Sequence, residues 1–147
     1  MYNYINYPSG ICNEPLNAEY TPDKITLLGC NEIFVFGSNI GGYHSGGAAR
    51  VAYERFGAQW GQGEGLQGNS YAIPTMQGGI DTIRPYVDKF IEFAKIHSEL
   101  VFYVTRIGCG IAGFRNEDIA PLFKSAIGIE NIRLPKVFIE IITVDKV

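Results

Sequence analysis

Hydrophobic residues follow two alternating patterns along the chain. Compact runs of β-branched and aromatic residues predict buried strands over residues 32–36, 71–74, 100–105 and 136–144. Segments whose apolar residues recur every three or four positions predict helices over residues 46–56, 82–96 and 117–126. Strands that alternate with helices need crossover connections, so we expect an α/β fold with a largely parallel central sheet under helical layers.

Local signals refine these helices and the loop between the first two of them. Pro85 falls in the first turn of the second predicted helix, where its missing N–H costs little. Asn116 is predicted to be the N-cap of the third helix. Residues 57–70 are rich in glycine and are predicted to be a loop that docks partly through Trp60 and Leu66.

The length of the chain fits one domain. Its 147 residues, 46% of them hydrophobic, are enough to bury about two thirds of the unfolded surface. Residues 1–22 are polar and interrupted by prolines, and Tyr2, Tyr4 and Tyr7 alternate as in a short edge strand. We therefore expect an N-terminal arm over residues 1–22, packed on one α/β domain over residues 23–147.

Charge and cysteine content exclude several classes of function. A net charge of −3 argues against general affinity for nucleic acid or for anionic membranes. Cys12, Cys30 and Cys109 are odd in number and lack zinc-ligand spacing, so we expect no metal, no cofactor and reduced thiols. The N-terminal residues lack the pattern of a signal peptide, and no apolar run is long enough to span a membrane. These features favour a cytoplasmic protein without a membrane partner.

Two glycine-rich segments stand where predicted strands end. The first covers residues 37–49 (GSNIGGYHSGGAA) and the second covers residues 108–114 (GCGIAGF). Glycine lets the backbone approach a ligand closely, and each segment leads into a predicted helix. Because the N–H groups and the dipole of a helix N-terminus favour an anion, two such loops on neighbouring strands are predicted to grip a diphosphate from both sides.

Four side chains in or near these segments are candidates for chemistry. Asn39 can bond sugar hydroxyls, or it holds its own turn. His44 is a candidate general acid or base, or it lies exposed in a flexible loop. Glu64 is a candidate base, or it keeps a glycine loop soluble. Cys109 lies between glycines ahead of a predicted helix, a setting that activates a thiol; alternatively the loop has room only for a small residue.

Taken together, the segments resemble the macrodomain superfamily of ADP-ribose-binding modules. Residues 34–39 (FVFGSN) and 46–49 (GGAA) occupy the places of the family's strand ending in Asn and of its glycine-rich loop. Residues 108–114 resemble the family's second loop, and residues 23–26 (DKIT) resemble its Gly-Asp-Ile-Thr element with one inserted residue. The resemblance covers residues 23–147; residues 34–75 also resemble a group of uncharacterised bacterial and phage proteins.

The resemblance implies a three-layer α/β/α fold that binds ADP-ribose or a related nucleotide diphosphate. By this likeness Asp23 would contact the adenine amino group, Asn39 the distal ribose, and Phe114 would pack against the ligand. The other implied ligand-binding residues are Gly37, Ser38, Gly46, Gly47, Ala48, Gly108, Cys109, Gly110, Ile111, Ala112 and Gly113.

Two departures from the family pattern bear on catalysis. Ala49 stands where many de-ADP-ribosylating macrodomains have Asp, and the paired glutamates of poly-ADP-ribose glycohydrolases are absent. In a hydrolase, Asn39 would orient the ribose and His44 or Glu64 would activate water. The alternatives are a non-catalytic reader of a nucleotide signal, a Rossmann-like nucleotide-processing enzyme and a purely structural role. The Rossmann-like alternative is disfavoured because the element Pro-Gly-Gly-x-Gly-Thr-x-x-Glu is missing.

Overall fold

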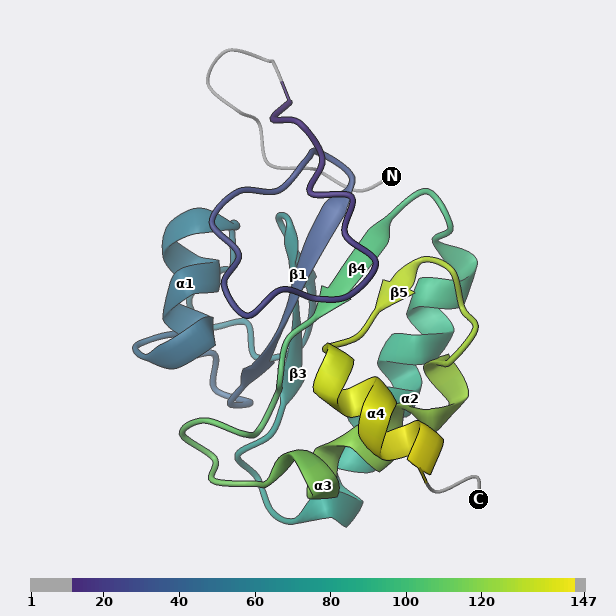
Figure 1. Ribbon diagram of the computed structural model, residues 1–147. Helices are drawn as coiled ribbons and strands as arrows, with labels where there is room; N and C mark the ends of the chain where they lie inside the picture. Colours follow the sequence, from purple (N-terminus) through teal and green to yellow (C-terminus); the bar gives the residue numbers. More distant parts are fainter. Residues whose placement is uncertain (1–11, 145–147) are drawn as a thin grey trace.

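The computed structural model describes residues 12–144 of the chain (Figure 1). The elements in chain order are β1 (Glu32–Ser38), α1 (Gly47–Arg55), β2 (Gly65–Gln67), β3 (Ser70–Pro74), α2 (Ile80–Ile96), β4 (Val101–Val104), α3 (Asn116–Ile119), the 3-10 helix η1 (Ala120–Ala126), β5 (Ile132–Arg133) and α4 (Lys136–Val144). None of the helices within the described residues is both long enough and apolar enough to cross a membrane.

Five strands form one mixed sheet in the order β2-β3-β1-β4-β5. β1 lies at the centre and pairs in parallel with β3 and β4, while β4 pairs in parallel with β5. β2 is antiparallel to β3. Residues 33–36 of β1 are buried, as expected for a strand that is covered on both faces. The predicted α/β class, the largely parallel sheet and the first three predicted strands are thus confirmed.

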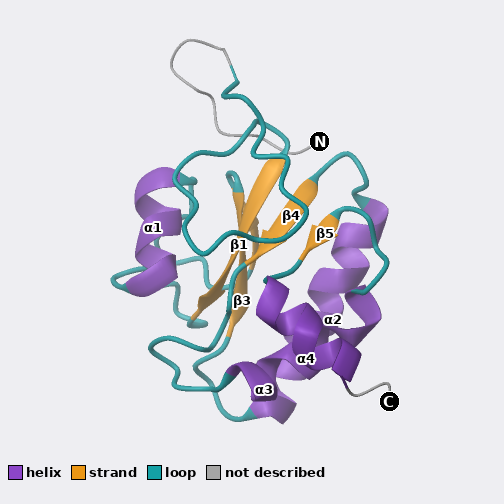
Figure 2. Ribbon diagram, in the orientation of Figure 1, coloured by secondary structure: helices purple, strands orange, loops and turns teal. Residues whose placement is uncertain are grey.

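Helices cover both faces of this sheet (Figures 1 and 2). Ile33 and Val35 pack into the larger core cluster, together with residues of α2, η1 and α4. Phe34 and Phe36 pack into a smaller cluster with α1 and with residues of the irregular segment 12–30. The division follows from the strand period, because successive side chains point to opposite faces.

A buried carboxylate anchors the irregular segment that precedes β1. Glu32 is 2% exposed and accepts the backbone N–H groups of Leu16, Asn17 and Gly29 at 2.7–3.0 Å. It also accepts the hydroxyl of Tyr103 at 3.2 Å. Three N–H donors and one O–H donor compensate the charge for lost hydration, and the segment is held against β1 and β4.

The cysteines depart from the prediction of three reduced thiols. Cys12 and Cys30 form a disulfide with their Cα atoms 5.3 Å apart, and Cys109 is the free cysteine among the described residues. The spacing of 18 residues gives no local signal, because the two thiols meet only when the segment folds back on itself. Disulfides are rare in cytosolic proteins. The prediction of a cytoplasmic location rested partly on three reduced thiols, and the disulfide removes that support. The edge strand predicted in the arm at residues 2–7 lies outside the described residues.

The strand predicted over residues 136–144 is wrong, because these residues form the helix α4. Phe138 and Ile142 are its buried residues, and the ring of Phe138 lies 6.0 Å from that of Phe123 in η1. Burial four residues apart is helical, but a run rich in isoleucine and valine has the composition of a strand. Periodicity alone does not separate the two for such a short apolar run.

All three predicted helices are present, and the second and third differ from the prediction at their starts. α2 begins at Ile80, so Pro85 stands inside the helix rather than in its first turn. The third helix begins with Asn116 as its first residue and Arg115 as its N-cap, whose N–H donates to the Asp118 carboxylate at 3.0 Å. It changes from α to 3-10 geometry at Ala120, next to a proline that lacks an N–H donor.

The predicted loop over residues 57–70 is only partly a loop, since it contains β2. Trp60 is 52% exposed, whereas Leu66 is partly buried against the larger core cluster. The hydroxyl of Ser38 donates to the carbonyl of Gly63 and ties this loop to the end of β1.

Candidate functional site

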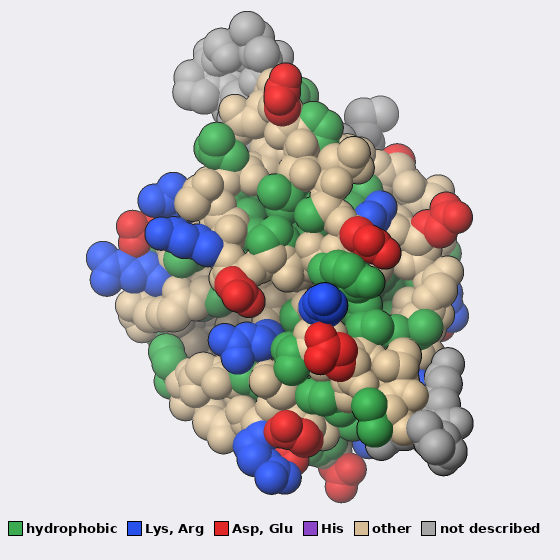
Figure 3. Space-filling model, viewed as in Figure 1, with side chains coloured by type: hydrophobic (Ala, Val, Ile, Leu, Met, Phe, Trp, Pro, Cys, Tyr) green, Lys and Arg blue, Asp and Glu red, His purple; other side chains and the backbone are tan. Residues whose placement is uncertain are grey.

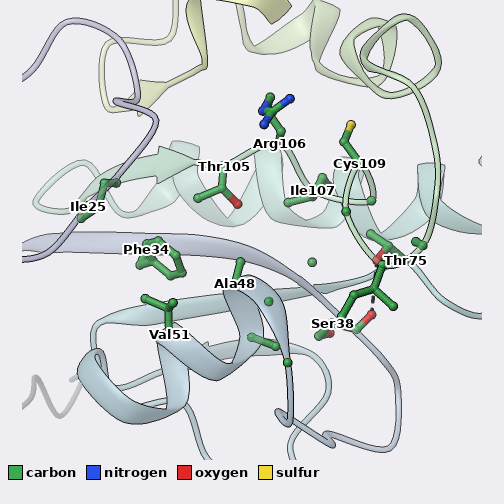
Figure 4. Close-up of a pocket in the computed structure, with 18 of the residues that line it drawn as sticks. Ile25, Phe34, Ser38, Ala48, Val51, Thr75, Thr105, Arg106, Ile107 and Cys109 are labelled. Atoms are coloured by element: carbon green, nitrogen blue, oxygen red, sulfur yellow. Dashed lines mark hydrogen bonds between the residues drawn. The ribbon is translucent and has the colours of Figure 1, made fainter.

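A cleft of about 620 Å³ lies between α1 and the loop that follows β4 (Figure 4). Most of its wall comes from residues 22–26, from residues 37–39 and 45–49 of the first glycine-rich segment, and from residues 75–76 and 105–112. The last three of these segments follow or end β1, β3 and β4, so the cleft lies at the carboxyl edge of parallel strands. Ligands of open α/β sheets bind at this edge, and the volume is that of a small-molecule site.

The N-terminus of α1 opens into the cleft without a side-chain cap. Its N-cap is Gly46, and its first turn, which includes Ala48 and Ala49, contains no acidic residue. The first intrahelical bond runs from the N–H of Arg50 to the carbonyl of Gly46 at 3.3 Å. The preceding N–H groups have no partner within the helix, and together with the helix dipole they make this end of α1 attractive to an anion.

The loop after β4 forms the opposite wall. Gly108 has φ +72°, and a Cβ added to Gly37 would lie 3.1 Å from the Gly108 nitrogen, so the loop lies directly against β1. Ile111 reaches toward α1, because its Cδ1 would lie 3.3 Å from a Cβ on Gly46. The two glycine-rich segments therefore face each other, with their residues Gly46, Gly47, Ala48 and 108–112 lining one cleft.

One end of the cleft is lined by apolar side chains and lies beside a carboxylate. Ile25, Phe34 and Val51 lie together at this end, on the far side of Ala48 from Ser38 and Thr75 (Figure 4). Asp23, two residues before Ile25, is exposed and belongs to the same wall. An apolar surface beside an acceptor suits a flat base that carries an amino group.

Hydroxyl and amide groups line the other end. The carbonyl of Ser38 accepts the Thr75 N–H at 2.8 Å and the Thr75 hydroxyl at 3.4 Å (Figure 4). Asn39 donates from Nδ2 to the Tyr43 carbonyl at 2.8 Å and accepts the Tyr43 N–H on Oδ1 at 2.9 Å. Asn39 therefore holds its turn, as one of the two interpretations predicts. Its second amide hydrogen and second lone pair leave it able to bond a ligand as well.

Basic side chains add a local positive charge to the cleft. Lys24, Arg55 and Arg106 line it, are exposed and form no ion pair with any residue in the described range 12–144. Figure 3 shows basic and acidic side chains interspersed over the face that it presents, rather than one basic patch. The charge arrangement suits a small anion in the cleft more than a long polyanion.

Cys109 lines the cleft without the character of an activated nucleophile. Burial raises the pKa of its thiol, and the nearby Arg106 guanidinium only partly opposes this effect. The side chains of Cys109 and Arg106 both point away from α1 in Figure 4. The fraction of thiolate at neutral pH is therefore below that of an ordinary cysteine, which favours the interpretation of Cys109 as a small loop residue.

Two predicted catalytic residues do not line the cleft. His44 is 1% exposed, its Nε2 lies 2.8 Å from the Gln59 carbonyl, and its ring packs edge-on against Phe36. Because a carbonyl only accepts, Nε2 is the donor, and Nδ1 has no partner among the described residues. Glu64 forms an ion pair at 3.2 Å with Lys89 of α2. Burial of His44 also contradicts the alternative of an exposed loop histidine.

Two residues of the predicted second loop lie outside the lining as well. Gly113 and Phe114 do not line the cleft. The N–H of Phe114 donates to the Gly108 carbonyl at 2.8 Å, and its ring packs against the larger core cluster. Phe114 therefore supports the loop from the core, in place of the predicted ligand contact.

Other lining residues were not predicted to bind a ligand. Thr75 and Thr105 directly follow β3 and β4, so the rule that ligands lie at strand ends could have found them. Tyr43, Met76 and Arg55 gave no such signal, because their position depends on how loops and α1 pack.

Fold and cleft together define an α/β protein with a candidate small-molecule site at the carboxyl edge of its sheet. No protein-family model, no curated protein and no solved structure matches the chain.

Proposed function

We propose that the cleft binds ADP-ribose or a related nucleotide diphosphate and that the fold is macrodomain-like. The observation that carries the proposal is the uncapped N-terminus of α1 opposite the glycine-rich residues 108–112 in one cleft. Backbone N–H groups directed from a helix N-terminus suit a diphosphate, and the exposed Lys24 and Arg55 of the cleft lining add charge of the right sign.

The two ends of the cleft match the remaining parts of such a ligand. At the apolar end, Ile25, Phe34 and Val51 would contact the adenine ring while Asp23 accepts its amino group. At the polar end, Asn39 and Thr75 would bond the hydroxyls of the distal ribose. Placing the diphosphate at α1 puts the adenosine and the distal ribose on opposite sides of it, which is the order of groups in ADP-ribose.

Binding without turnover is the form of the proposal that the geometry favours. Among the described residues that line the cleft, Asp23 is the only acidic one, and it belongs to the apolar end. His44 is buried under the first loop and Glu64 pairs with Lys89, so neither is placed to activate water at the distal ribose. We therefore favour a reader or sequesterer of the nucleotide over a hydrolase.

A charge substitution at the start of α1 tests the anion site. Ala48 is exposed, lines the cleft and lies in the first helical turn. We expect Ala48→Asp to weaken ADP-ribose binding at least about tenfold, because two negative charges would share one site at a cost of more than about 1.4 kcal/mol. The matched neutral variant Ala48→Asn should stay within a few-fold of wild type.

The measurement is calorimetric titration with ADP-ribose, with AMP and ADP as comparators and chromatography of each sample for products. The Asp variant should fold, because an acidic residue stabilises a helix N-terminus. Equal ADP-ribose affinity of the Ala48→Asp and Ala48→Asn variants would contradict the placement of the diphosphate at the N-terminus of α1. Absence of heat with all three nucleotides would overturn the proposal. Formation of products would show that the protein is an enzyme and not a reader. In that case we expect Glu64→Ala to retain full activity.

A further inference from the structure

Three of the residues that line the cleft have large apolar side chains that are exposed to solvent. Tyr43, Met76 and Ile111 line the cleft and are 63%, 47% and 73% exposed. They come from the loops after β1, β3 and β4, which are neighbouring strands. Exposed apolar residues that line one cleft from three loops indicate a contact surface, since each leaves apolar area in water.

Tyr43 is exposed, yet both its backbone and its ring are held by neighbouring residues. Asn39 bonds both its N–H and its carbonyl. The Tyr43 ring lies edge-on to the Trp60 ring, with the ring centroids 6.0 Å apart and the ring planes at 69°. A Cβ on Gly41 would lie 2.6 Å from the Tyr43 ring, so the ring takes up space that only glycine leaves open. The turn thus presents a fixed aromatic ring at the mouth of the cleft.

We infer that Tyr43 is a stacking platform for a second aromatic ring carried on the distal ribose of the ligand. The cleft would then take a dinucleotide, in which two ring-bearing nucleosides are joined by a diphosphate, in preference to ADP-ribose with its bare distal ribose. This inference rests on the proposed function, because it uses the diphosphate position at α1 and the distal ribose position at Asn39.

The position of Tyr43 is the reason that we infer a ring on the distal ribose of the ligand. Tyr43 lines the cleft and is 63% exposed, and a Cβ on Gly41 would lie 2.6 Å from its ring and 3.5 Å from Asn39 Oδ1, so the ring lies beside the amide of the polar end. A bare ribose is polar and would leave the exposed apolar side chains of Tyr43 and Met76 in water. A flat ring attached to that ribose would stack on Tyr43, an interaction that is tolerant of ring identity.

The test compares NAD+, ADP-ribose and ADP by calorimetry, with chromatography to verify that NAD+ stays intact. NAD+ is ADP-ribose plus a ring on the distal ribose. We expect wild-type protein to bind NAD+ about five- to 150-fold more tightly than ADP-ribose, the range that one base–aromatic stack supplies. Tyr43→Ala should abolish this preference with little change for ADP, and Tyr43→Phe should retain it.

Tyr53→Ala is the matched control. The Tyr53 ring is 47% exposed and packs on Trp60 at 5.6 Å, but the residue does not line the cleft. This variant should keep the preference for NAD+. Equal or weaker binding of NAD+ by wild-type protein, or an equal loss of NAD+ and ADP-ribose affinity in Tyr43→Ala, would overturn the inference and leave the proposed function standing. Absence of binding by all three nucleotides would overturn both.

Discussion

At the scale of single residues, one amide side chain determines much of the geometry of the cleft mouth. Asn39 forms two hydrogen bonds to the backbone of Tyr43, and this pair of bonds fixes the turn that carries the exposed ring. An asparagine after a buried strand can therefore close a turn with one hydrogen and one lone pair and still have one of each free for the ligand contact that we propose.

Cys109 gives a prediction about pH. Burial raises the pKa of its thiol above the ordinary 9.0, so the folded protein holds less thiolate than the unfolded chain at pH 7–8. We expect iodoacetamide to alkylate Cys109 more slowly in native than in urea-unfolded protein at pH 7.5, with the difference shrinking at higher pH as the native thiol ionises. Mass spectrometry of the peptide that contains Cys109 measures both rates. Faster alkylation of the native protein at pH 7.5 would show instead that the thiol is activated.

At the scale of elements, a buried carboxylate of β1 anchors the segment that precedes this strand. Glu32 accepts three backbone N–H groups from that segment and the Tyr103 hydroxyl from β4. The same segment supplies part of the apolar end of the cleft through Ile25. The shape of the cleft is therefore tied to an interaction on the central strand of the sheet.

Replacing this carboxylate by an amide tests the role of the segment. Glu32→Gln places an NH2 donor against N–H donors, so we expect a loss of about 2–4 kcal/mol in the free energy of unfolding. Urea denaturation followed by tryptophan fluorescence and far-UV circular dichroism measures it. Glu130→Gln, at an exposed position, is the control and should change stability by less than about 0.5 kcal/mol. Similar unfolding free energies for the two variants would contradict an anchoring role for Glu32.

At the scale of the whole molecule, the disulfide closes a loop that includes one wall of the cleft. Cys12 and Cys30 are separated by 18 residues, and residues 22–26 lie between them. Closing a loop of this length restricts the unfolded chain and stabilises the folded state by about 3 kcal/mol. The stability of the domain and the integrity of the cleft are therefore linked to the redox state of one pair of cysteines.

Reduction should show this link directly. We expect a thiol titration of denatured protein to find one free thiol before reduction and three after it, because the chain has three cysteines and one pair is joined. Reduction should lower the melting temperature by roughly 6–12 °C. The double variant Cys12→Ala/Cys30→Ala should melt at the lower temperature and no longer respond to the reductant. Three free thiols in untreated protein would contradict the pairing.

The sequence by itself determined the parts of this protein that depend on local pattern. The run at residues 32–36 is a strand, the glycine-rich segments follow strands, and the periodic residues 82–96 are helical. Apolar periodicity and glycine are properties of neighbouring residues, so they are visible before the chain folds. The placement of the two glycine segments on one cleft also follows, since parallel strands end at the same edge.

The tertiary structure alone decided everything that depends on contacts between distant residues. α4 is a helix because Phe138 and Ile142 pack on η1 and the larger core, although their neighbours have the composition of a strand. His44 is buried and Glu64 pairs with α2, which no local signal indicates. Cys12 meets Cys30 only through the fold of the segment before β1. Which side chains reach the cleft is set by packing and by long-range hydrogen bonds, and a one-dimensional pattern does not contain these distances.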